Sequence, residues 1–378
     1  MTDLRKEKIL KILAIYIVIL LFVPLFQKEF NIFKDRPLKG SFSIVNDTVF
    51  SLKTWFSGDY QDVKEKFINQ NYGFRNFFIR YNNQIAFSFY NKVFANGVIV
   101  GKKNYLYEYN YIKAYNGDDY VGDDSIKKIV KRISLISDTL NKLNKSLIIF
   151  FAPGKGSYYP EYIPDSLIKY TGKSNIKTYQ NEIKDKKIKV IDFHKWFIDN
   201  KKKPPFPLYP KYGIHWSVRS NFFVADSLVK YIEKIRKKEL QHIVFDKVNK
   251  KNAIDVDCDI ADGLNLLFDI NGDIMEYPEY HLEPKNKKDS VTMVVIADSF
   301  YWTIFGKGLS NIFGKNEFWY YNQQAYPNSP EQPKEVSQLN FADEINNHEV
   351  FIILSTDANL SNLGWGFIQN CCKYFGIK

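Results

Sequence analysis

The sequence contains few of the residue types from which metal, disulfide and redox sites are built. Among 378 residues there are only 3 cysteines and 5 histidines. Cys258, Cys371 and Cys372 have neither zinc-site spacing nor a paired framework, and the last two are adjacent and so poorly placed to bridge each other. Four of the histidines are scattered without metal-ligand spacing: His194, His242, His281 and His348. We therefore predict that the protein holds no metal.

Other signatures are absent as well. The sequence has no Walker loop and no dinucleotide-binding fingerprint, so we expect no cofactor. It also lacks internal repeats and low-complexity tracts. The hydrophobic fraction of 45% and the aromatic fraction of 17% exclude a disordered chain and suffice for a large core. A formal net charge of +11 fits contact with nucleic acid, with an acidic polysaccharide or with an anionic membrane surface.

One long apolar run stands near the N-terminus, and no second one follows. It extends over residues 9–26, about 18 residues, which is close to the minimum for crossing a bilayer. Arg5, Lys6, Lys8 and Lys11 lie at its amino end, so the positive-inside rule places the N-terminus in the cytoplasm. No small-residue cleavage site follows the run. We predict a retained signal anchor, with the rest of the chain outside the cytoplasm; the competing interpretation is an amphipathic surface or core helix.

The remaining pattern predicts an α/β fold with a mainly parallel sheet. Short apolar runs typical of buried strands alternate with helical patterns, and this alternation favours a parallel sheet covered by helices on both faces. A β-hairpin is expected over residues 98–107 and a helix over 124–143. The expected strands are residues 146–151, 190–192, 291–297, 317–321 and 350–354. Residues from about 253 to 284 break this rhythm, and we interpret them as an insertion.

Two short motifs, far apart in the chain, carry the chemistry. Ala297-Asp298-Ser299-Phe300 follows a buried strand, at the carboxyl edge where open α/β sheets bind ligands. Gly213-Ile214-His215-Trp216-Ser217 leads into a helical pattern, for which Ser217 is the expected cap. A histidine delivered from another loop can take the proton from a serine hydroxyl. The two motifs therefore predict Ser299 as a nucleophile and His215 as its general base.

These motifs resemble blocks of a known family. Ala297-Asp298-Ser299-Phe300 resembles the Gly-Asp-Ser block of SGNH-type esterases and acyltransferases, and His215-Trp216-Ser217 resembles a block of the AlgX/AlgJ-type alginate O-acetyltransferases. Further similar segments occur in the family's order, over roughly residues 55–355. They are Asn71-Tyr72-Gly73-Phe74-Arg75, the hairpin from Val100 to Tyr107, Phe151-Ala152-Pro153-Gly154-Lys155 with Tyr159-Pro160-Glu161, and Asp262-Gly263-Leu264.

The resemblance implies an SGNH-like three-layer αβα domain that transfers an acyl group, usually acetyl, to hydroxyls of an exported polysaccharide. It implies an acyl donor delivered by an MBOAT-type membrane protein, and no nucleic acid. Together with the anchor predicted from the apolar run, it implies a single-pass protein of a bacterial inner membrane, with its catalytic domain in the periplasm or outside the cell. The resulting organisation is a cytoplasmic tail (1–8), a transmembrane anchor (9–26), a juxtamembrane linker (27–54) and the SGNH-like domain (55–378).

The sequence departs from the family pattern at two positions. The family's aspartate two residues before the histidine is Gly213 here, and Ala297 replaces the glycine of the Gly-Asp-Ser block. The aspartate would orient the imidazole and stabilise its cation. A backbone carbonyl, or a carboxylate from elsewhere such as Asp357, is a candidate replacement.

Other residues beside the motifs are candidates for supporting roles. Asp298 is expected to order the turn, and Asn322 is a candidate oxyanion donor together with the backbone N–H of Ser299. Lys155 is placed to contact a substrate carboxylate or to order the site. Trp216, Tyr301 and Trp302 are candidates for stacking on sugar rings, although we expect at least one of them to be a core residue.

Two rival functions remain open from the sequence. The same serine and histidine could pass the acyl group to water, which would make the protein a carbohydrate acetylesterase. Alternatively, the domain could be a non-catalytic, glycan-binding or scaffold partner of a membrane-bound O-acyltransferase, and the missing aspartate at Gly213 favours that alternative.

Overall fold

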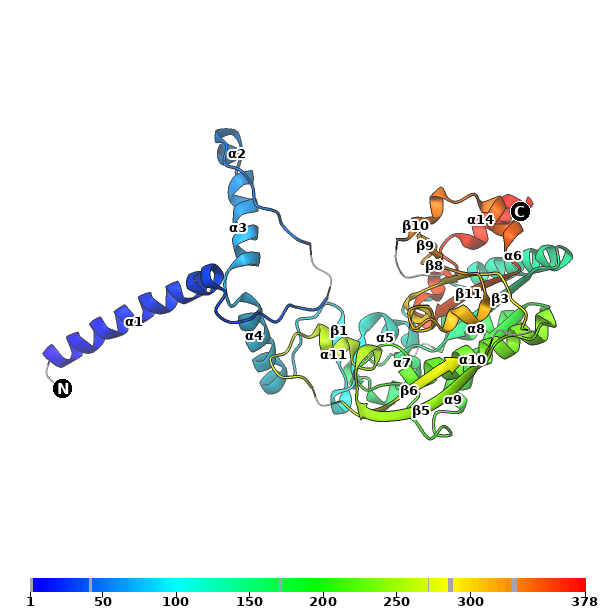
Figure 1. Ribbon diagram of the computed structural model, residues 1–378, viewed down its shortest axis with the longest axis horizontal. Helices are drawn as coiled ribbons and strands as arrows, with labels where there is room; N and C mark the ends of the chain where they lie inside the picture. The colour runs from blue at the N-terminus through cyan, green and yellow to red at the C-terminus, as the bar shows by residue number, and fades with distance from the viewer. Residues whose placement is uncertain (1–2, 41–42, 170–171, 271, 285–287, 328–331) are drawn as a thin grey trace. The chain divides into compact units, whose positions relative to one another are not determined.

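The computed structural model describes residues 3–40, 43–169, 172–270, 272–284, 288–327 and 332–378 (Figure 1). Two residues of the predicted cytoplasmic tail, two of the predicted linker and one of the predicted insertion lie outside this description. The chain forms two compact units. One consists of residues 1–95 and 261–270, and the other of residues 96–260 and 271–378. The first boundary therefore falls after Ala95, whereas the sequence placed the start of the large domain at residue 55.

The first unit begins with a single long apolar helix. Its helices are α1 (Asp3–Phe30), α2 (Leu52–Ser57), α3 (Asp59–Asn71) and α4 (Arg75–Tyr90). Within α1, the segment Lys6–Phe30 contains an 18-residue window with a mean hydropathy of 2.8 and no buried residue, so by length and composition it can cross a membrane. This helix contains the predicted anchor at residues 9–26 and continues beyond it at both ends.

The second unit is built around a seven-stranded mixed sheet. Its order is β10-β9-β8-β7-β11-β3-β4, in which β8, β7, β11, β3 and β4 are parallel and β9 and β10 are antiparallel. The strands are β3 (Ser146–Ala152), β4 (Lys189–Asp192), β7 (Met293–Ala297), β8 (Asn316–Tyr320), β9 (Gln324–Pro327), β10 (Lys334–Glu335) and β11 (Val350–Thr356). The five parallel strands are the five that the sequence predicted, so the predicted fold class is confirmed.

Two antiparallel ribbons accompany this sheet. The predicted hairpin is confirmed as β1 (Val98–Val100) paired with β2 (Leu106–Glu108). The other ribbon pairs β5 (Ile243–Asn252) with β6 (Ile274–Leu282), and the sequence did not predict it. β5 is largely solvent-exposed and β6 mixes buried, partly buried and exposed residues, so neither strand shows the buried apolar runs that revealed the central strands.

Helices cover both faces of the sheet, as in a three-layer αβα domain. The helices of this unit are α5 (Tyr109–Asn116), α6 (Asp123–Lys142), α7 (Lys155–Tyr158), α8 (Asn175–Ile183), α9 (Phe193–Asp199), α10 (Val218–Arg236), α12 (Trp302–Phe305), α13 (Phe341–Asn347) and α14 (Phe367–Phe375). A short helix, α11 (Asp259–Gly263), begins in this unit and ends in the first.

The two faces of the sheet pack against different helices. Ile126, Val130 and Ile133 of α6, one apolar stripe at helical spacing, join Ile149 of β3 and Ile353 of β11 in one core cluster. α8 and α14 contribute to the same cluster. On the opposite face, the ring of Phe150 lies 5.3 Å from Phe193 of α9 and 6.4 Å from Trp216, just before α10. Side chains alternate across a strand, so both faces of β3 are buried.

Candidate active site

Ser299 lies at the carboxyl end of a central strand. The strand β7 ends at Ala297, and Ser299 opens a 3-10 turn (Ser299–Tyr301) that leads directly into α12. The buried Asp298 caps this turn by accepting from the N–H of Phe300 at 3.1 Å. The rest of its carboxylate accepts from Thr356 N and Oγ1 and from Asn359 Nδ2, all within 2.9 Å. Asp298 therefore fixes the serine turn to the end of β11, and none of these hydrogen bonds involves His215.

His215 reaches the serine from a different loop. Its Nε2 lies 3.0 Å from Ser299 Oγ, and its Nδ1 lies 2.6 Å from Asp259 Oδ2. A carboxylate only accepts hydrogen bonds, so Nδ1 carries the proton and Nε2 is the free base facing the hydroxyl. Ser299, His215 and Asp259 thus form a continuous chain of hydrogen bonds with the geometry of a catalytic triad.

The carboxylate that the sequence left unidentified is Asp259. Its other oxygen, Oδ1, accepts from the N–H of Ile214 at 2.8 Å, so both oxygens hold the segment that carries His215. Asp259 opens α11, just after the 3-10 turn Asp255–Asp257, inside the predicted insertion. The only sequence signal for it was the run of acidic residues Asp255, Asp257 and Asp259. The spacing of these residues from His215 does not show which of them meets the histidine.

The close approach of this insertion explains Gly213. A Cβ at residue 213 would lie 2.1 Å from the carbonyl oxygen of Val256 and 3.0 Å from the backbone carbonyl carbon of Asp257. No side chain fits there without movement of the backbone. The acidic segment therefore occupies the space beside residue 213 and brings its own carboxylate, Asp259, to the imidazole.

The electrostatics of His215 follow from two opposed effects. Burial lowers the pKa of His215, but the charge of Asp259 and its hydrogen bond raise it by more, so the net pKa lies above that of a free imidazole. Glu108, at the end of β2, is a second carboxyl group close enough to interact with this pair. Burial raises the pKa of Glu108, and the histidine cation opposes that rise. No motif in the sequence pointed to Glu108.

Lys155 holds the loop that carries His215 by hydrogen bonds to its backbone. Its side chain is fully buried, and Nζ donates to the carbonyls of Lys211 and Gly213 at 2.8 and 2.6 Å. Burial lowers the pKa of Lys155 to about 7. The suggestion that Lys155 contacts a substrate carboxylate is therefore wrong, because the side chain is enclosed; the alternative, that it orders the site, agrees with its contacts.

Replacing Lys155 tests this ordering role. We expect Lys155→Met to leave the buried carbonyl of Gly213 without a donor, at a cost of about 1–3 kcal/mol, whereas the carbonyl of Lys211 keeps the N–H of Leu106 at 3.2 Å. A loosened His215 loop should then lower kcat for ester turnover about 10- to 100-fold. Thermal unfolding and ester kinetics measure both effects. Lys211→Met is the matched control, since its Nζ rests on the rings of Tyr105 and Tyr212; equal losses in both variants would contradict the role of Lys155.

Two other candidate residues have hydrogen-bond or ion-pair partners other than Ser299 and His215. Asp357 does not contact His215: its carboxylate accepts from Ser157 Oγ and lies 3.5 Å from His194 Nε2. Asn322 Nδ2 donates to the carbonyl of Trp365 at 3.0 Å. The suggestion that Asp357 replaces the family aspartate is therefore corrected to Asp259.

The aromatic candidates belong to the core rather than to an open platform. Trp216 is fully buried and donates from Nε1 to Thr303 Oγ1 at 2.9 Å. Tyr301 is fully buried and donates to Asn316 Oδ1 at 2.9 Å. These two residues cannot stack on a sugar. Trp302 is partly exposed and packs among Phe318, Tyr320 and Tyr326.

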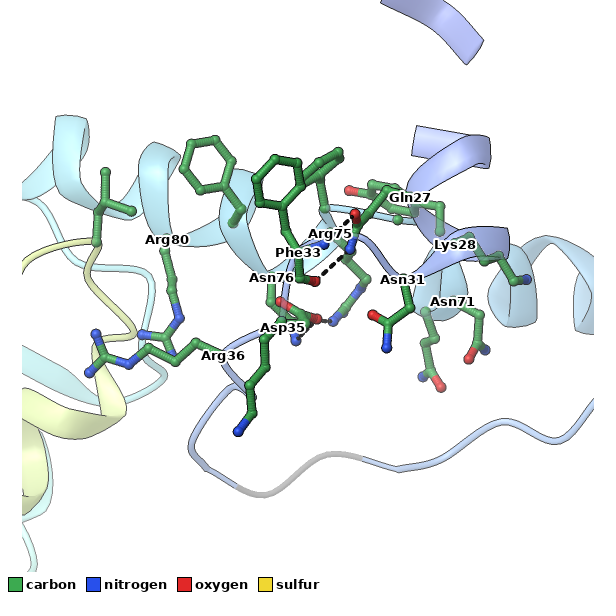
Figure 2. Close-up of a pocket in the computed structure, with 17 residues that line it drawn as sticks. Gln27, Lys28, Asn31, Phe33, Asp35, Arg36, Asn71, Arg75, Asn76 and Arg80 are labelled. Atoms are coloured by element: carbon green, nitrogen blue, oxygen red, sulfur yellow. Dashed lines mark hydrogen bonds between the residues drawn. The ribbon is translucent and has the colours of Figure 1, made fainter. Parts of the chain in front are cut away.

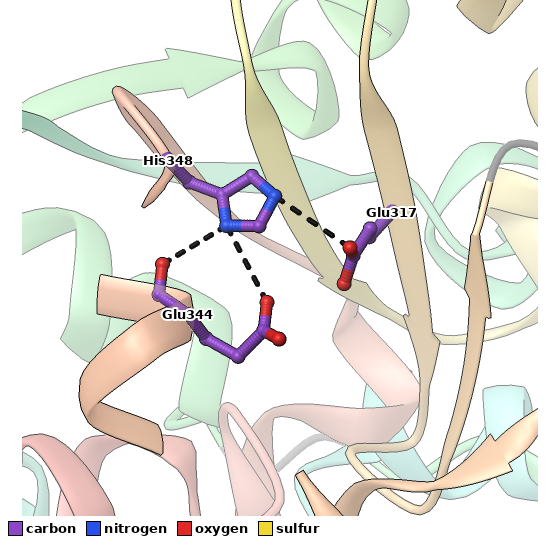
Figure 3. A group of neighbouring side chains, drawn as sticks. All are labelled: Glu317, Glu344 and His348. Carbon is purple, nitrogen blue, oxygen red and sulfur yellow. Dashed lines mark hydrogen bonds and ion pairs between the residues drawn. The ribbon is translucent and has the colours of Figure 1, made fainter. Parts of the chain in front are cut away.

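A separate cluster of titratable groups lies at the opposite, amino edge of the sheet (Figure 3). Within the described ranges, Glu317, Glu344 and His348 are the one group of side chains close enough together to hold a metal ion. His348 Nε2 lies 3.7 Å from Glu317 Oε1, and Lys315 Nζ lies 3.1 Å from the same oxygen. Burial and the neighbouring Glu317 raise the pKa of Glu344 to about 7. Lys315 thus pairs with Glu317, and the raised pKa of Glu344 favours its neutral form.

Fold and site together define an SGNH-like α/β domain with a serine–histidine–aspartate arrangement at the carboxyl edge of its sheet. Residues 98–253 match the family model described as the SGNH hydrolase-like domain of acetyltransferase AlgX. The resemblance to AlgX/AlgJ-type acetyltransferases drawn from the motifs is thereby confirmed over this segment. The matched segment contains His215 and ends before Asp259 and Ser299.

Several solved structures are similar to this chain. The O-acetyltransferase domain of Pseudomonas putida AlgJ is 13% identical, with 70% of this chain and 92% of that chain covered and a TM-score of 0.46. Bacillus cereus PatB1 is 15% identical, with 71% and 98% covered and a TM-score of 0.45. Pseudomonas aeruginosa AlgX is 12% identical, with 73% and 67% covered and a TM-score of 0.45. At these values the similarities support no statement about function. No curated protein sequence matches the chain.

Proposed function

We propose that this protein is an extracytoplasmic O-acyltransferase that moves an acyl group, most simply acetyl, through an ester on Ser299. The single observation that carries the proposal is the hydrogen-bonded chain from Ser299 through His215 to Asp259. A serine hydroxyl is a weak nucleophile at neutral pH, and a correctly oriented histidine is what activates it.

The proposed reaction has two steps that use the same base. In the first, His215 Nε2 takes the Ser299 proton while Oγ attacks the donor's carbonyl carbon, and the proton then passes to the leaving group. The backbone N–H of Ser299 is the candidate donor to the oxyanion, and a single such donor is worth about 3 kcal/mol. In the second step a sugar hydroxyl loses its proton to His215 and attacks the acyl-serine carbonyl, which releases the new ester and restores Ser299.

The proposal also specifies the acyl acceptor, the acyl donor and the cellular location of the protein. We infer an exported polysaccharide as acceptor and an acyl donor supplied through an MBOAT-type membrane protein, as the AlgX/AlgJ resemblance implies. α1 supports single-pass anchoring in the bacterial inner membrane, with the second unit on the periplasmic or outer side. The net charge of +11 suits an acidic glycan or membrane surface.

The geometry of the site weakens one of the two rival functions and leaves the other open to experiment. The scaffold alternative depended on the missing aspartate at Gly213, and the Asp259 contact removes that reason for preferring it. The esterase alternative uses the same three residues with water as acceptor, so it is an outcome of the experiment that follows.

Trapping the acyl-serine tests the proposed function. We expect the full chain in detergent to turn over a chromogenic acetyl ester and to carry a transient acetyl adduct, measured by intact mass. Ser299→Ala should lose the adduct and lower turnover by about 10³-fold or more. Ser337→Ala, at an exposed serine, is the control. An adduct that persists in Ser299→Ala would refute the assignment. Acetyl recovered on an added glycan indicates a transferase, and acetate alone indicates an esterase.

A further inference from the structure

The first unit contains a cavity that the acyl-transfer site does not use (Figure 2). Its volume is about 660 Å³, and it lies where α1 ends and α4 begins. Its charged lining is strongly one-sided: the acidic member is Asp35, and the cations are Lys28, Lys34, Arg36, Arg75 and Arg80. Asn76 Nδ2 donates to Asp35 at 2.7 Å, so the carboxylate is engaged by an amide.

The motif Asn71-Tyr72-Gly73-Phe74-Arg75 builds this cavity. A Cβ at Gly73 would lie 2.2 Å from the carbonyl oxygen of Pro24 and 2.7 Å from the backbone nitrogen of Lys28, so only glycine allows α1 to come this close. Gln27 fixes the exit of α1 by donating to the Phe33 carbonyl at 2.7 Å and accepting from its N–H at 3.1 Å. The cavity is thus tied to the last turn of the apolar helix.

The N-terminus of α4 points positive charge at the cavity. Phe74, the residue before the helix, has φ of 62° and makes no side-chain capping hydrogen bond. Phe74, Arg75, Asn76 and Phe77 all line the cavity. The first turn of a 16-residue helix has unpaired N–H groups and the positive end of the helix dipole, and both favour phosphate.

Arg80 supplies an independent sign of an anionic ligand. It is 4% exposed, and its hydrogen bonds go to neutral carbonyls, those of Pro37 at 2.7 Å and Leu266 at 3.1 Å. Its Nε is buried without a hydrogen-bond partner among the described residues. The neighbouring Arg36 is paired with Asp269 at 2.6 Å and repels Arg80, whereas Asp269, Asp35 and Asp262 attract Arg80 without a direct ion pair. Burying a guanidinium without a carboxylate in direct contact is costly, and an anion in the cavity would compensate that cost.

We propose that this cavity binds the phosphate group of an anionic membrane lipid. The proposal rests on the membrane anchoring proposed above. If Lys6–Phe30 crosses the bilayer, a cavity lined by Gln27, Lys28 and Asn31 lies at the depth of the lipid phosphates. Arginine and lysine side chains, together with a helix N-terminus, recognise phosphate by charge-assisted hydrogen bonds. The bound headgroup then fixes the exit of α1 against α4.

Lipid retention by the full chain in detergent tests this site. We expect native mass spectrometry to detect bound phosphatidylglycerol at least about fivefold more often than phosphatidylcholine. Arg75→Gln and Arg80→Gln should each lower phosphatidylglycerol retention about tenfold. Lys66→Gln, an exposed cation of α3 outside the lining, is the matched control. Arg75 is partly exposed, so its replacement keeps the test valid if Arg80→Gln does not fold.

Each alternative result has a defined meaning. Equal phosphatidylglycerol retention in Arg75→Gln and Lys66→Gln would overturn the proposal. Inorganic phosphate that raises the melting temperature in an Arg75-dependent way, with no effect of phosphatidylglycerol, would assign the site to a soluble phosphate and also overturn it. Ser299→Ala should retain lipid like the wild type, which separates this site from acyl transfer. Carbonate extraction of membranes tests the anchoring separately, since lipid retention in detergent does not depend on it.

Discussion

Asp259→Asn should lower kcat/KM for ester turnover by about 10³- to 10⁴-fold while the domain stays folded. The substitution keeps the size of the side chain and removes the charge that holds Nδ1–H of His215 at 2.6 Å. An amide can offer its NH₂ group to Nδ1 instead, and the imidazole then presents the wrong tautomer to Ser299. Circular dichroism and thermal unfolding establish the fold, and ester kinetics measure the loss.

The pH profile gives a second, independent readout of the same variant. His215 acts as a base only when neutral, so activity rises as pH increases through its pKa. In the wild type this rise should lie at a higher pH than the titration of a free imidazole, because Asp259 raises the pKa of His215 by more than burial lowers it. Without that charge, burial dominates, and the residual activity of Asp259→Asn should rise at lower pH. A structural defect alone would reduce activity without moving this limb.

Asp357→Asn is the informative comparison. Asp357 is the carboxylate that the sequence suggested, but its contacts are with Ser157 and His194. We therefore expect its replacement to leave the acid limb of the pH profile where it is in the wild type. If the acid limb of the pH profile shifted in Asp357→Asn but not in Asp259→Asn, the Ser299–His215–Asp259 arrangement would be refuted.

Gly213→Ala should destabilise the domain by about 3 kcal/mol and lower ester turnover by at least about 100-fold. The added methyl group would lie 2.1 Å from the Val256 carbonyl oxygen, closer than any side chain tolerates, so the acidic segment must move away. That movement displaces Asp259 from His215 and from the N–H of Ile214. Restoring the family's aspartate as Gly213→Asp should be at least as harmful.

Chemical denaturation and ester kinetics of two glycine variants separate this steric effect from the general effect of replacing a glycine by alanine. Gly263→Ala is the matched control, because a Cβ at Gly263 meets nothing within 4 Å. We expect its free energy of unfolding to stay within about 0.5 kcal/mol of the wild type. If Gly213→Ala were as stable and as active as Gly263→Ala, the close approach of the 255–259 segment would be wrong.

Local sequence was enough where the signal is local. Buried strands such as 146–152 and 293–297 are unbroken apolar runs, and their alternation with helices predicted the parallel sheet. The place of Ser299 followed in the same way, because a residue after a parallel strand must lie at the carboxyl edge. The capping serine of α10 was also predicted: Ser217 accepts from Ser220 N at 3.1 Å.

Long-range geometry decided the rest. Nothing in the spacing of Asp259 from His215, 44 residues apart, shows that their side chains meet. The same holds for Lys155, whose partners lie 56 and 58 residues away. Trp216 lies within one motif and Tyr301 directly follows the other, yet both side chains point into the core. Their burial depends on segments distant in the chain, which the motifs do not show.

The sequence by itself determined the α/β fold, the apolar helix and the serine and histidine motifs, because each is encoded by neighbouring residues whose periodicity follows from helix and strand geometry. Only the tertiary structure decided which carboxylate orients the histidine and why residue 213 is glycine. Both depend on where an inserted segment returns against the His215 loop, and the contacts that fix its path join residues distant in the chain.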